Sequence, residues 1–273
     1  MVRGAAGLWD KFWKKEREHE ELYLPHHFLL NAIHNSVRVK GKKVLEVGGG
    51  RGADSFKLVS EGAWSTAIDR SWNSIRLISS RTASQGVKIR LVMADARYLP
   101  FKSGTFDLIS HQGFLEHFRD PVPYLKQQIR LLKPSGYVVI SVPQRYNIYT
   151  LKKRLFIALN KWPFGWEASF SLSGLRKLLK RCGLEVVNQL GSGFDGGFLD
   201  MIVRYFHWRG MKRFGKPVIP ERIGNAIENF WKWIEKSRLG GAFFLHLGLQ
   251  LCIVAQKKTT LRIDNGGTFL HHE

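Results

Sequence analysis

The sequence predicts an α/β fold in which a parallel sheet is covered by helices on both faces. Between residues 43 and 144, short apolar runs of strand character alternate with longer stretches of helical spacing. Apolar strands separated by helices indicate a parallel sheet, because each connection has to cross one face of the sheet to start the next strand. A chain of 273 residues, of which 44% are hydrophobic and 24% charged, is long enough to bury a substantial core around such a sheet.

Each element follows from its own pattern. Seven runs are predicted to be strands: 43–47 (KVLEV), 64–68 (WSTAI), 88–93 (KIRLVM), 106–110 (FDLIS), 136–142 (GYVVISV), 184–190 (LEVVNQL) and 248–256 (GLQLCIVAQ). Helical spacing predicts helices near 52–60, 71–84, 121–132 and 171–181, and further helices within the first forty residues.

Two basic, aromatic segments interrupt the alternation, at 145–168 and 194–240, and the second holds two amphipathic stretches that carry tryptophan. The expected organisation is a helical cap at 1–40, a core at 41–192 together with 246–257, two insertions at 145–168 and 194–240, and a flexible tail at 258–273. Material inserted after the fifth strand and before the last one is expected to cover the site and to set its specificity.

The charge is unusual. The 43 Lys and Arg residues exceed the 22 Asp and Glu residues, which leaves a net charge of +21. Such a surface favours anionic partners, namely nucleic acid, acidic lipid headgroups or phosphorylated substrates, and does not choose among them. The alternative, a surface that only keeps the protein soluble, stays open.

The two cysteines, Cys182 and Cys252, indicate neither a disulfide framework nor a zinc site, so a reducing, cytoplasmic location is expected. Residues 1–8 lack the apolar core of a signal peptide, and the most apolar stretch, 239–255, contains three glycines, a histidine and a glutamine. That stretch is predicted to be a buried strand and its approach.

The stretch VLEVGGGRGAD, residues 44–54, is where a cofactor is expected. Gly48, Gly50 and Ala53 satisfy the dinucleotide fingerprint G-x-G-x-x-G/A, which points to a nicotinamide or flavin enzyme. Glu46, Gly48, Gly50 and Gly52 equally satisfy E/D-x-G-x-G-x-G, the pattern of proteins that bind S-adenosylmethionine. Glycines permit a sharp turn and a close approach of the backbone to either cofactor.

Acidic residues at strand ends separate the two interpretations. Asp69 ends the second strand, where a carboxylate can accept both ribose hydroxyls of either cofactor. Glu46 lies where it would repel a pyrophosphate but could orient a cofactor that carries a sulfonium and an ammonium group. Asp95 ends the third strand, where it can accept from the adenine amino group while the Ala96 amide donates to the ring. Together the three acids favour S-adenosylmethionine.

With these residues in place, the chain resembles the class I S-adenosylmethionine-dependent methyltransferases of the type 11 group. The resemblance covers roughly residues 40–190 and is carried by VLEVGGGRG, AIDRSW, MADARYLPFKSGTFDLI, FLEHFRDP and LLKPSGYVVISVP. It implies a Rossmann-like seven-stranded sheet, mostly parallel, with an antiparallel last strand. It also implies cofactor contacts from Glu46, Gly48, Gly50, Gly52, Asp69, Arg70, Asp95, Ala96 and His111. KPSG in place of the family's KPGG is a mild departure.

Methyl transfer from a sulfonium is an in-line displacement, in which a general base assists when the acceptor is a hydroxyl. His111, at the end of the fourth strand, is the first candidate for that base, and a non-catalytic, hydrogen-bonded His111 is the alternative. His117 is a second candidate, although the family-wide FLEHF segment favours a packing role for it, and Tyr146 and Glu167 stand behind these two. Some related quinone O-methyltransferases hold a metal with Glu-x-x-Glu-His, but Gly113 replaces the first Glu here, so no metal is expected.

The fourth strand continues as HQGF rather than N/D-P-P-Y, which disfavours amino-group methylation of adenine or glutamine. A small-molecule, glycan or lipid-linked acceptor remains, with O-methylation favoured and Tyr146, Trp166 and Glu167 as lid residues facing it. The basic aromatic segments, with Lys152, Lys153 and Arg154 on their surface, either pack as a lid whose charges face water or contact a membrane peripherally. Single-stranded nucleic acid, and with it an RNA-directed methyltransferase or a basic binding module, is the alternative, and a nicotinamide-dependent oxidoreductase is a further one.

Overall fold

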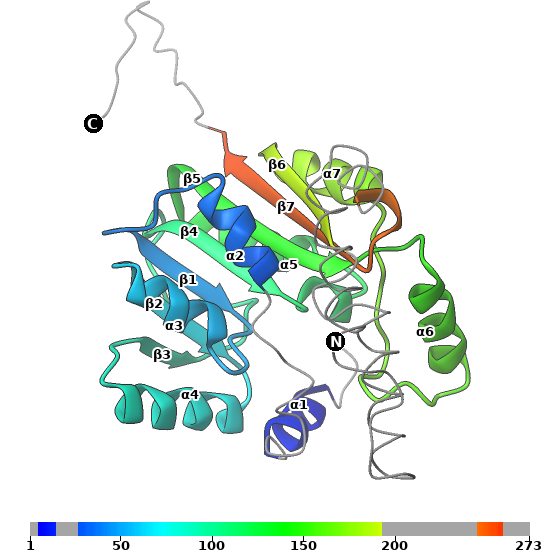
Figure 1. The fold of residues 1–273 in the computed structure, drawn as a ribbon, viewed down its shortest axis with the longest axis horizontal. Coiled ribbons are helices and arrows are strands. Elements are labelled where there is room, and N and C mark those ends of the chain that lie inside the picture. The colour runs from blue at the N-terminus through cyan, green and yellow to red at the C-terminus, as the bar shows by residue number, and fades with distance from the viewer. Residues whose placement is uncertain (1–4, 15–26, 193–244, 259–273) are drawn as a thin grey trace, which may run out of the picture.

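The computed structural model describes residues 5–14, 27–192 and 245–258, and the seven predicted strands form one sheet within these ranges (Figure 1). The sheet has the order β3-β2-β1-β4-β5-β7-β6. The strands are β1 (Lys43–Val47), β2 (Trp64–Asp69), β3 (Arg90–Met93), β4 (Phe106–Gln112), β5 (Leu132–Pro143), β6 (Leu184–Ser192) and β7 (Gln250–Lys257).

The strand directions confirm the predicted Rossmann-like arrangement. The pairs β1–β2, β1–β4, β2–β3 and β4–β5 are parallel, whereas β7 is antiparallel to both β5 and β6. The strand order reverses between β1 and β4, because the chain first builds outward to β3 and then returns to the other side of β1. In an open α/β sheet such a switch point, at the carboxyl ends of the strands, is where ligands bind.

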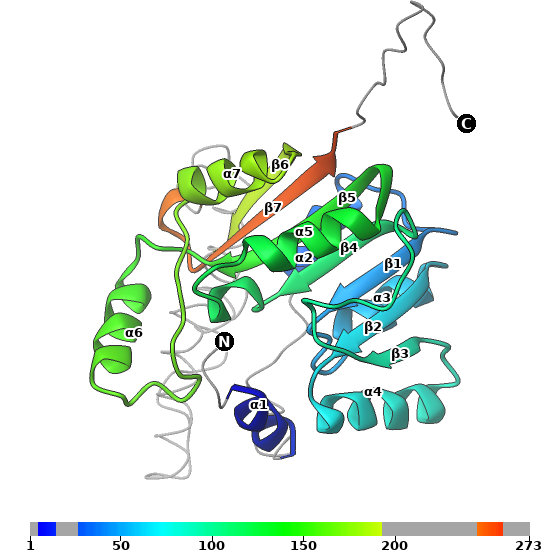
Figure 2. The same cartoon turned by 180° about the vertical axis from the view of Figure 1, so that it is seen from behind.

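Helices cover both faces of the sheet (Figures 1 and 2). On one face α2 (His27–His34) and α3 (Ala53–Ser60) pack on Val44, Leu108 and Val139. On the other, α5 (Val122–Leu131) and α7 (Leu172–Arg181) pack on their strand neighbours, which include Leu45, Ile109 and Val138. Because consecutive strand residues point to opposite faces, a run such as KVLEV fills both layers of core at once.

Two further helices lie near the carboxyl edge of the sheet, α1 (Ala5–Lys14) and α6 (Ile148–Ala158), and α4 (Trp72–Gln85) connects β2 to β3. Side chains of Ser71, Asn147 and Ser171 cap α4, α6 and α7 by accepting a backbone amide hydrogen at each N-terminus. The predicted helical stretches of 194–240 and the tail from 259 onward lie outside the described residues. None of the described helices is long and apolar enough to cross a membrane.

The KPSG departure has a structural consequence. Ser135 has φ 57°, in the left-handed region that glycine adopts without penalty. A non-glycine residue there costs on the order of 1–2 kcal/mol. The Ser135 carbonyl accepts a hydrogen bond from Gln256 Nε2 at 3.0 Å, which ties this turn to β7.

Candidate active site

The glycine turn after β1 forms as the sequence predicts. Gly48, Gly50 and Gly52 have φ values of 72°, 52° and 70°, all in the left-handed region. The amides of Gly48 and Gly49 donate to the Ile68 carbonyl at 2.9 and 2.8 Å, which fixes the turn to the end of β2. A side chain at any of the three positive-φ positions would therefore be strained, and the glycines are required by the backbone itself.

Asp69, at the end of β2, holds this turn closed. Its Oδ2 accepts from the Gly50 amide at 3.0 Å and its Oδ1 from the Ser71 amide at 2.8 Å. Burial raises the pKa of the Asp69 carboxyl, against these hydrogen bonds, which lower it. The Ser74 side chain and the Arg70 backbone also lower this pKa by hydrogen bonding, so the ribose hydroxyls that the sequence assigned to Asp69 would share the carboxylate with these groups.

Glu46 is buried and faces the start of α3. Its Oε2 accepts from the Ser55 amide at 3.1 Å, and its side chain lies near Asp54. Burial, with a contribution from the Asp54 charge, raises the pKa of Glu46 to about 8, and burial raises that of Asp54 as well. The structure thus places beside the glycine turn a pair of carboxyls whose pKa values are raised, where the sequence predicted one ionised carboxylate.

Asp95 lies in an arginine cluster that the sequence did not predict. Its two oxygens accept from Arg97 Nε at 3.0 Å and Arg97 Nη2 at 2.7 Å, and Arg70 Nη1 lies 3.6 Å away. The hydrogen bonds from Arg97 hold the pKa of Asp95 below its usual value. Ala96 is buried next to it. An Asp followed two residues later by an Arg is too common a pattern for the sequence alone to predict this bidentate pair.

His111, at the end of β4, is buried in apolar surroundings, and its ring lies 5.4 Å from that of Phe114. Among the described residues, neither ring nitrogen has a hydrogen-bond partner. Burial lowers the pKa of His111 to about 3, so the imidazole is neutral at physiological pH. The structure therefore offers His111 no group that would stabilise the imidazolium formed when a base accepts a proton.

The residues predicted to form the lid divide into two groups. Tyr146 is 57% exposed, and Trp166 packs under the guanidinium of Arg119 at 5.0 Å, so neither joins the cluster described next. The side chain of Glu167 is only 9% exposed and pairs with Lys153, whose side chain is 1% exposed. The prediction that Lys153 lies on a basic surface is wrong. In α6 it is the inward-facing residue of the KKR run, whereas Lys152 and Arg154 are exposed.

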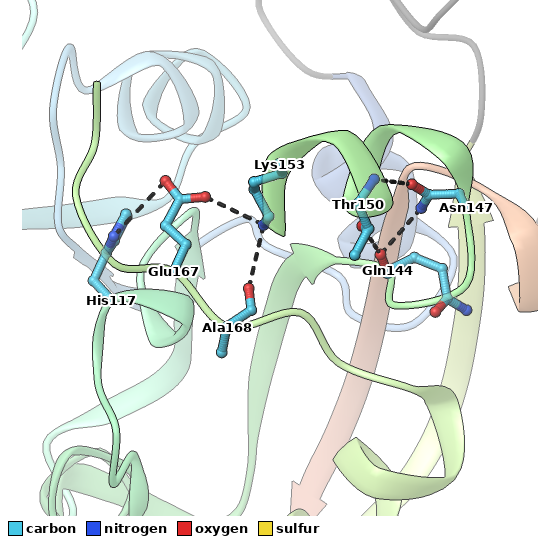
Figure 3. A network of polar contacts seen from close by, with 7 residues as sticks. All are labelled: His117, Gln144, Asn147, Thr150, Lys153, Glu167 and Ala168. Atoms are coloured by element: carbon cyan, nitrogen blue, oxygen red, sulfur yellow. Dashed lines mark hydrogen bonds and ion pairs between the residues drawn. The ribbon is translucent and has the colours of Figure 1, made fainter. Parts of the chain in front are cut away.

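A buried polar cluster follows from this pairing (Figure 3). Lys153 Nζ donates to Glu167 Oε2 at 3.2 Å and to the Ala168 carbonyl at 3.3 Å. The other oxygen of the same carboxylate, Oε1, lies 4.0 Å from His117 Nδ1. Glu116 is also buried here; burial raises its pKa to about 8. Within the described ranges, no group of three His, Cys, Asp or Glu side chains could hold a metal ion.

The helix α1 covers the glycine turn, which sequence analysis missed. A Cβ placed on Gly50 would lie 2.7 and 2.9 Å from two ring carbons of Trp13, so this indole occupies the space directly over the turn. Asp10 anchors the helix to α4, since its Oδ1 accepts from Ser71 Oγ at 2.9 Å and from the Asn73 amide at 3.1 Å. Figure 1 shows α1 and α4 side by side.

The strand order with its antiparallel β7 is that of the class I S-adenosylmethionine-dependent methyltransferases, and the glycine turn with its acids lies at the switch point where that fold binds its cofactor. Residues 45–140 match the family model described as a methyltransferase domain. These residues therefore form a methyltransferase domain of the resembled type 11 group, and S-adenosylmethionine is its cofactor. The dinucleotide interpretation of the glycine turn is set aside.

Individual relatives agree with this class. A curated ubiquinone biosynthesis O-methyltransferase from Coxiella burnetii is 31% identical over 140 residues, which cover 51% of this chain and 60% of the relative. One from Chromobacterium violaceum is 32% identical over 142 residues, again covering 60% of the relative. This chain thus spans about 60% of the length of the curated relatives it matches.

The solved structures show the fold. A Thermotoga maritima protein described as a possible histamine N-methyltransferase superposes with a TM-score of 0.61 at 18% identity, over 92% of this chain and 100% of that one. The [4+2]-cyclase SpnF superposes with a TM-score of 0.58 at 17% identity, over 86% and 81% of the two chains. Because proteins described as a methyltransferase and as a cyclase share the fold, the reaction has to be argued from the residues of the site.

Proposed function

We propose that the protein is an S-adenosylmethionine-dependent methyltransferase that methylates an oxygen atom of a small-molecule or lipid-linked acceptor. The observation that carries the proposal is the arrangement of Glu46, Asp69 and Asp95 at three neighbouring strand ends around one glycine turn. Each acid matches one part of this cofactor. Asp69 can accept hydrogen bonds from the ribose hydroxyls, Asp95 can accept one from the adenine amino group, and the buried Glu46 can lie near the cofactor's sulfonium and ammonium groups. The names of the curated relatives support oxygen as the acceptor atom.

The chain's residues supply positioning and proton acceptance. S-adenosylmethionine, when bound, supplies an activated methyl group. Holding two reactants in attack geometry is worth roughly 7–11 kcal/mol in intramolecular reactions. A positioned general base adds about 10²–10⁴-fold. The segment after β4 supports O-methylation because it carries the imidazole of His117, whose pKa is lowered by burial but raised by the nearby Glu167 charge, whereas burial lowers the pKa of His111 to about 3 and makes it a poor proton acceptor.

The proposal is tested by binding and by turnover with the purified chain. Calorimetry is expected to show that S-adenosylhomocysteine binds with micromolar affinity. In a separate fluorescence titration, NADH is expected to show no enhancement on mixing with the protein. Tritium transfer from S-adenosylmethionine is then measured to a panel of phenols and catechols, with amines of matched size as the control. Transfer to hydroxyls that survives a chelator supports a metal-independent O-methyltransferase. Binding of NADH, or transfer to the amines alone, would contradict it.

The face of α6 that points away from Lys153 supports the expected membrane contact. Leu151, Leu155 and Leu159 recur every four residues and are 69%, 57% and 54% exposed. Lys152 and Arg154 are exposed between them. Three leucines on one stripe with cations beside them match the interface of an anionic bilayer, where burying each leucine contributes about 1.5–3 kcal/mol.

Vesicle binding tests this surface. The double substitution L155Q/L159Q is expected to lower co-sedimentation with vesicles that contain phosphatidylglycerol at least tenfold, because two apolar side chains no longer enter the interface. Val187→Gln, on a 47% exposed side chain of β6, is the matched control and should leave binding unchanged. If the chain prefers single-stranded RNA to vesicles, or if the double variant binds vesicles fully, the membrane proposal is wrong.

A further inference from the structure

The cluster in Figure 3 joins three elements that are distant in the sequence. His117 ends the short 3₁₀ helix Leu115–His117 after β4, Lys153 belongs to α6, and Glu167 lies in the segment that leads to α7. The Glu167 carboxylate lies between the other two side chains, with one oxygen on each. Lid and core thus meet at this carboxylate.

The ion pair is not explained by stability. Side chains of Lys153 and Glu167 are 1% and 9% exposed. Withdrawing each ion from water costs several kcal/mol, which the attraction between the two offsets at best. Apolar side chains of similar volume are often neutral or stabilising in such positions. A buried pair beside a histidine therefore calls for a role that needs the charge.

The surroundings of His117 favour proton acceptance at its outer nitrogen. Its Nδ1 is the atom nearest Glu167, at 4.0 Å, and the ring of Trp9 packs edge-on at 4.8 Å. Burial lowers the pKa of His117, the Glu167 charge raises it, the Lys153 charge lowers it, and a hydrogen bond to the Gly113 backbone raises it. The Glu167 charge, which lies 4.0 Å from Nδ1 and outside hydrogen-bond distance, favours a proton on that nitrogen and so leaves Nε2 as the proton acceptor. His111, by contrast, has no such carboxylate.

We propose that His117 is the general base of the methyl transfer and that Glu167 and Lys153 are its positioning residues. The inference rests on the proposed O-methyltransferase function. As the acceptor oxygen forms its bond to the methyl carbon and the carbon–sulfur bond breaks, the hydroxyl proton passes to His117 Nε2. The products are the methyl ether, S-adenosylhomocysteine and the imidazolium, whose charge Glu167 balances. Lys153 holds the Glu167 carboxylate in place through its hydrogen bond to Oε2.

Kinetics separate this role from a packing role. His117→Gln is expected to lower kcat by about 10²–10⁴-fold, with the affinity for S-adenosylhomocysteine unchanged. Glu167→Gln should shift the acidic limb of the kcat profile to lower pH, since its charge raises the pKa of His117, and Lys153→Met should shift it to higher pH. Packing defects would not move the limb in opposite directions. Lys177→Met, on an exposed lysine of α7, is the control.

Two additions keep the test decisive. If Lys153→Met does not fold, the double variant K153M/E167Q removes both buried charges and should fold and match Glu167→Gln. Nitrogen-15 NMR of His117, assigned by difference from His117→Gln, should show the Nδ1-protonated tautomer and the same opposite pKa shifts without any turnover. A Nε2-protonated ring, or full kcat in His117→Gln, would overturn the inference. Absence of methyl transfer in the wild type with the expected tautomer would instead contradict the proposed function alone.

Discussion

Replacing Asp69 with alanine is expected to lower the affinity for S-adenosylhomocysteine by roughly 10²–10⁴-fold. Two ribose hydroxyls lose a charged acceptor, and hydrogen bonds to charged groups contribute about 1.5–3 kcal/mol each. The free protein is affected too, because the Gly50 and Ser71 amides both lose their acceptor. The measurement is calorimetric titration, with circular dichroism to show that the sheet is intact.

Two controls define what the loss means. Asp69→Asn keeps one acceptor oxygen and should fall between the wild type and Asp69→Ala. Glu185→Ala removes an exposed acid from β6, at the far edge of the sheet, and should bind normally. An affinity for Asp69→Ala within threefold of the wild type would show that Asp69 only ties the turn together and does not hold the ribose.

The sheet could be predicted from the sequence because its information is local. Each strand is a short apolar run, and each glycine or acid of the turn follows directly from the strand that ends before it. The predicted strand starting at 88 begins at Arg90, and that starting at 136 begins at Leu132, which pairs with Phe106 across a bulge. Such ends depend on pairing with a neighbour, which periodicity does not encode.

The missed parts of the site depend on contacts between distant segments. Residues 5–14 have an amphipathic pattern, which predicts a helix but does not say that Trp13 packs on Gly50. The run KKR is typical of a solvated surface, and only the position of α6 turns Lys153 toward Glu167. The ion pair is a property of the tertiary structure, since Glu167 itself shows no pattern that would select Lys153 over its neighbours.

Cofactor binding at pH 7 is expected to release up to about one proton from Glu46. Burial and the Asp54 charge raise the pKa of Glu46 to about 8, so the free protein carries this proton at neutral pH. A sulfonium and an ammonium group bound nearby favour the ionised form and lower the pKa again. Affinity for S-adenosylmethionine should therefore rise with pH between about 6 and 8, and Glu46→Gln should weaken both the rise and the proton release, leaving only what Asp54 contributes.

The release is measured as the dependence of the calorimetric enthalpy on the ionisation enthalpy of the buffer. Glu116→Gln is the matched control, because Glu116 is equally buried, has a pKa raised to about 8, and lies outside the glycine turn. It should leave the proton release unchanged. A buffer-independent enthalpy, or the same release in Glu46→Gln, would mean that Glu46 only accepts from the Ser55 amide and does not meet the cofactor.

The free energy of unfolding reports on the same Glu46 proton. It is expected to fall as pH rises, whereas the cofactor affinity is expected to rise. With its pKa raised in the folded state, Glu46 keeps its proton from about pH 4.5 to 8 while the unfolded chain loses it, so the free energy of unfolding falls as pH rises through that window. Glu46→Gln stays neutral throughout and should melt higher than the wild type at pH 8 but not at pH 4. A variant that is more stable at pH 8 yet binds the cofactor less tightly would show that this buried acid is retained for binding rather than for folding.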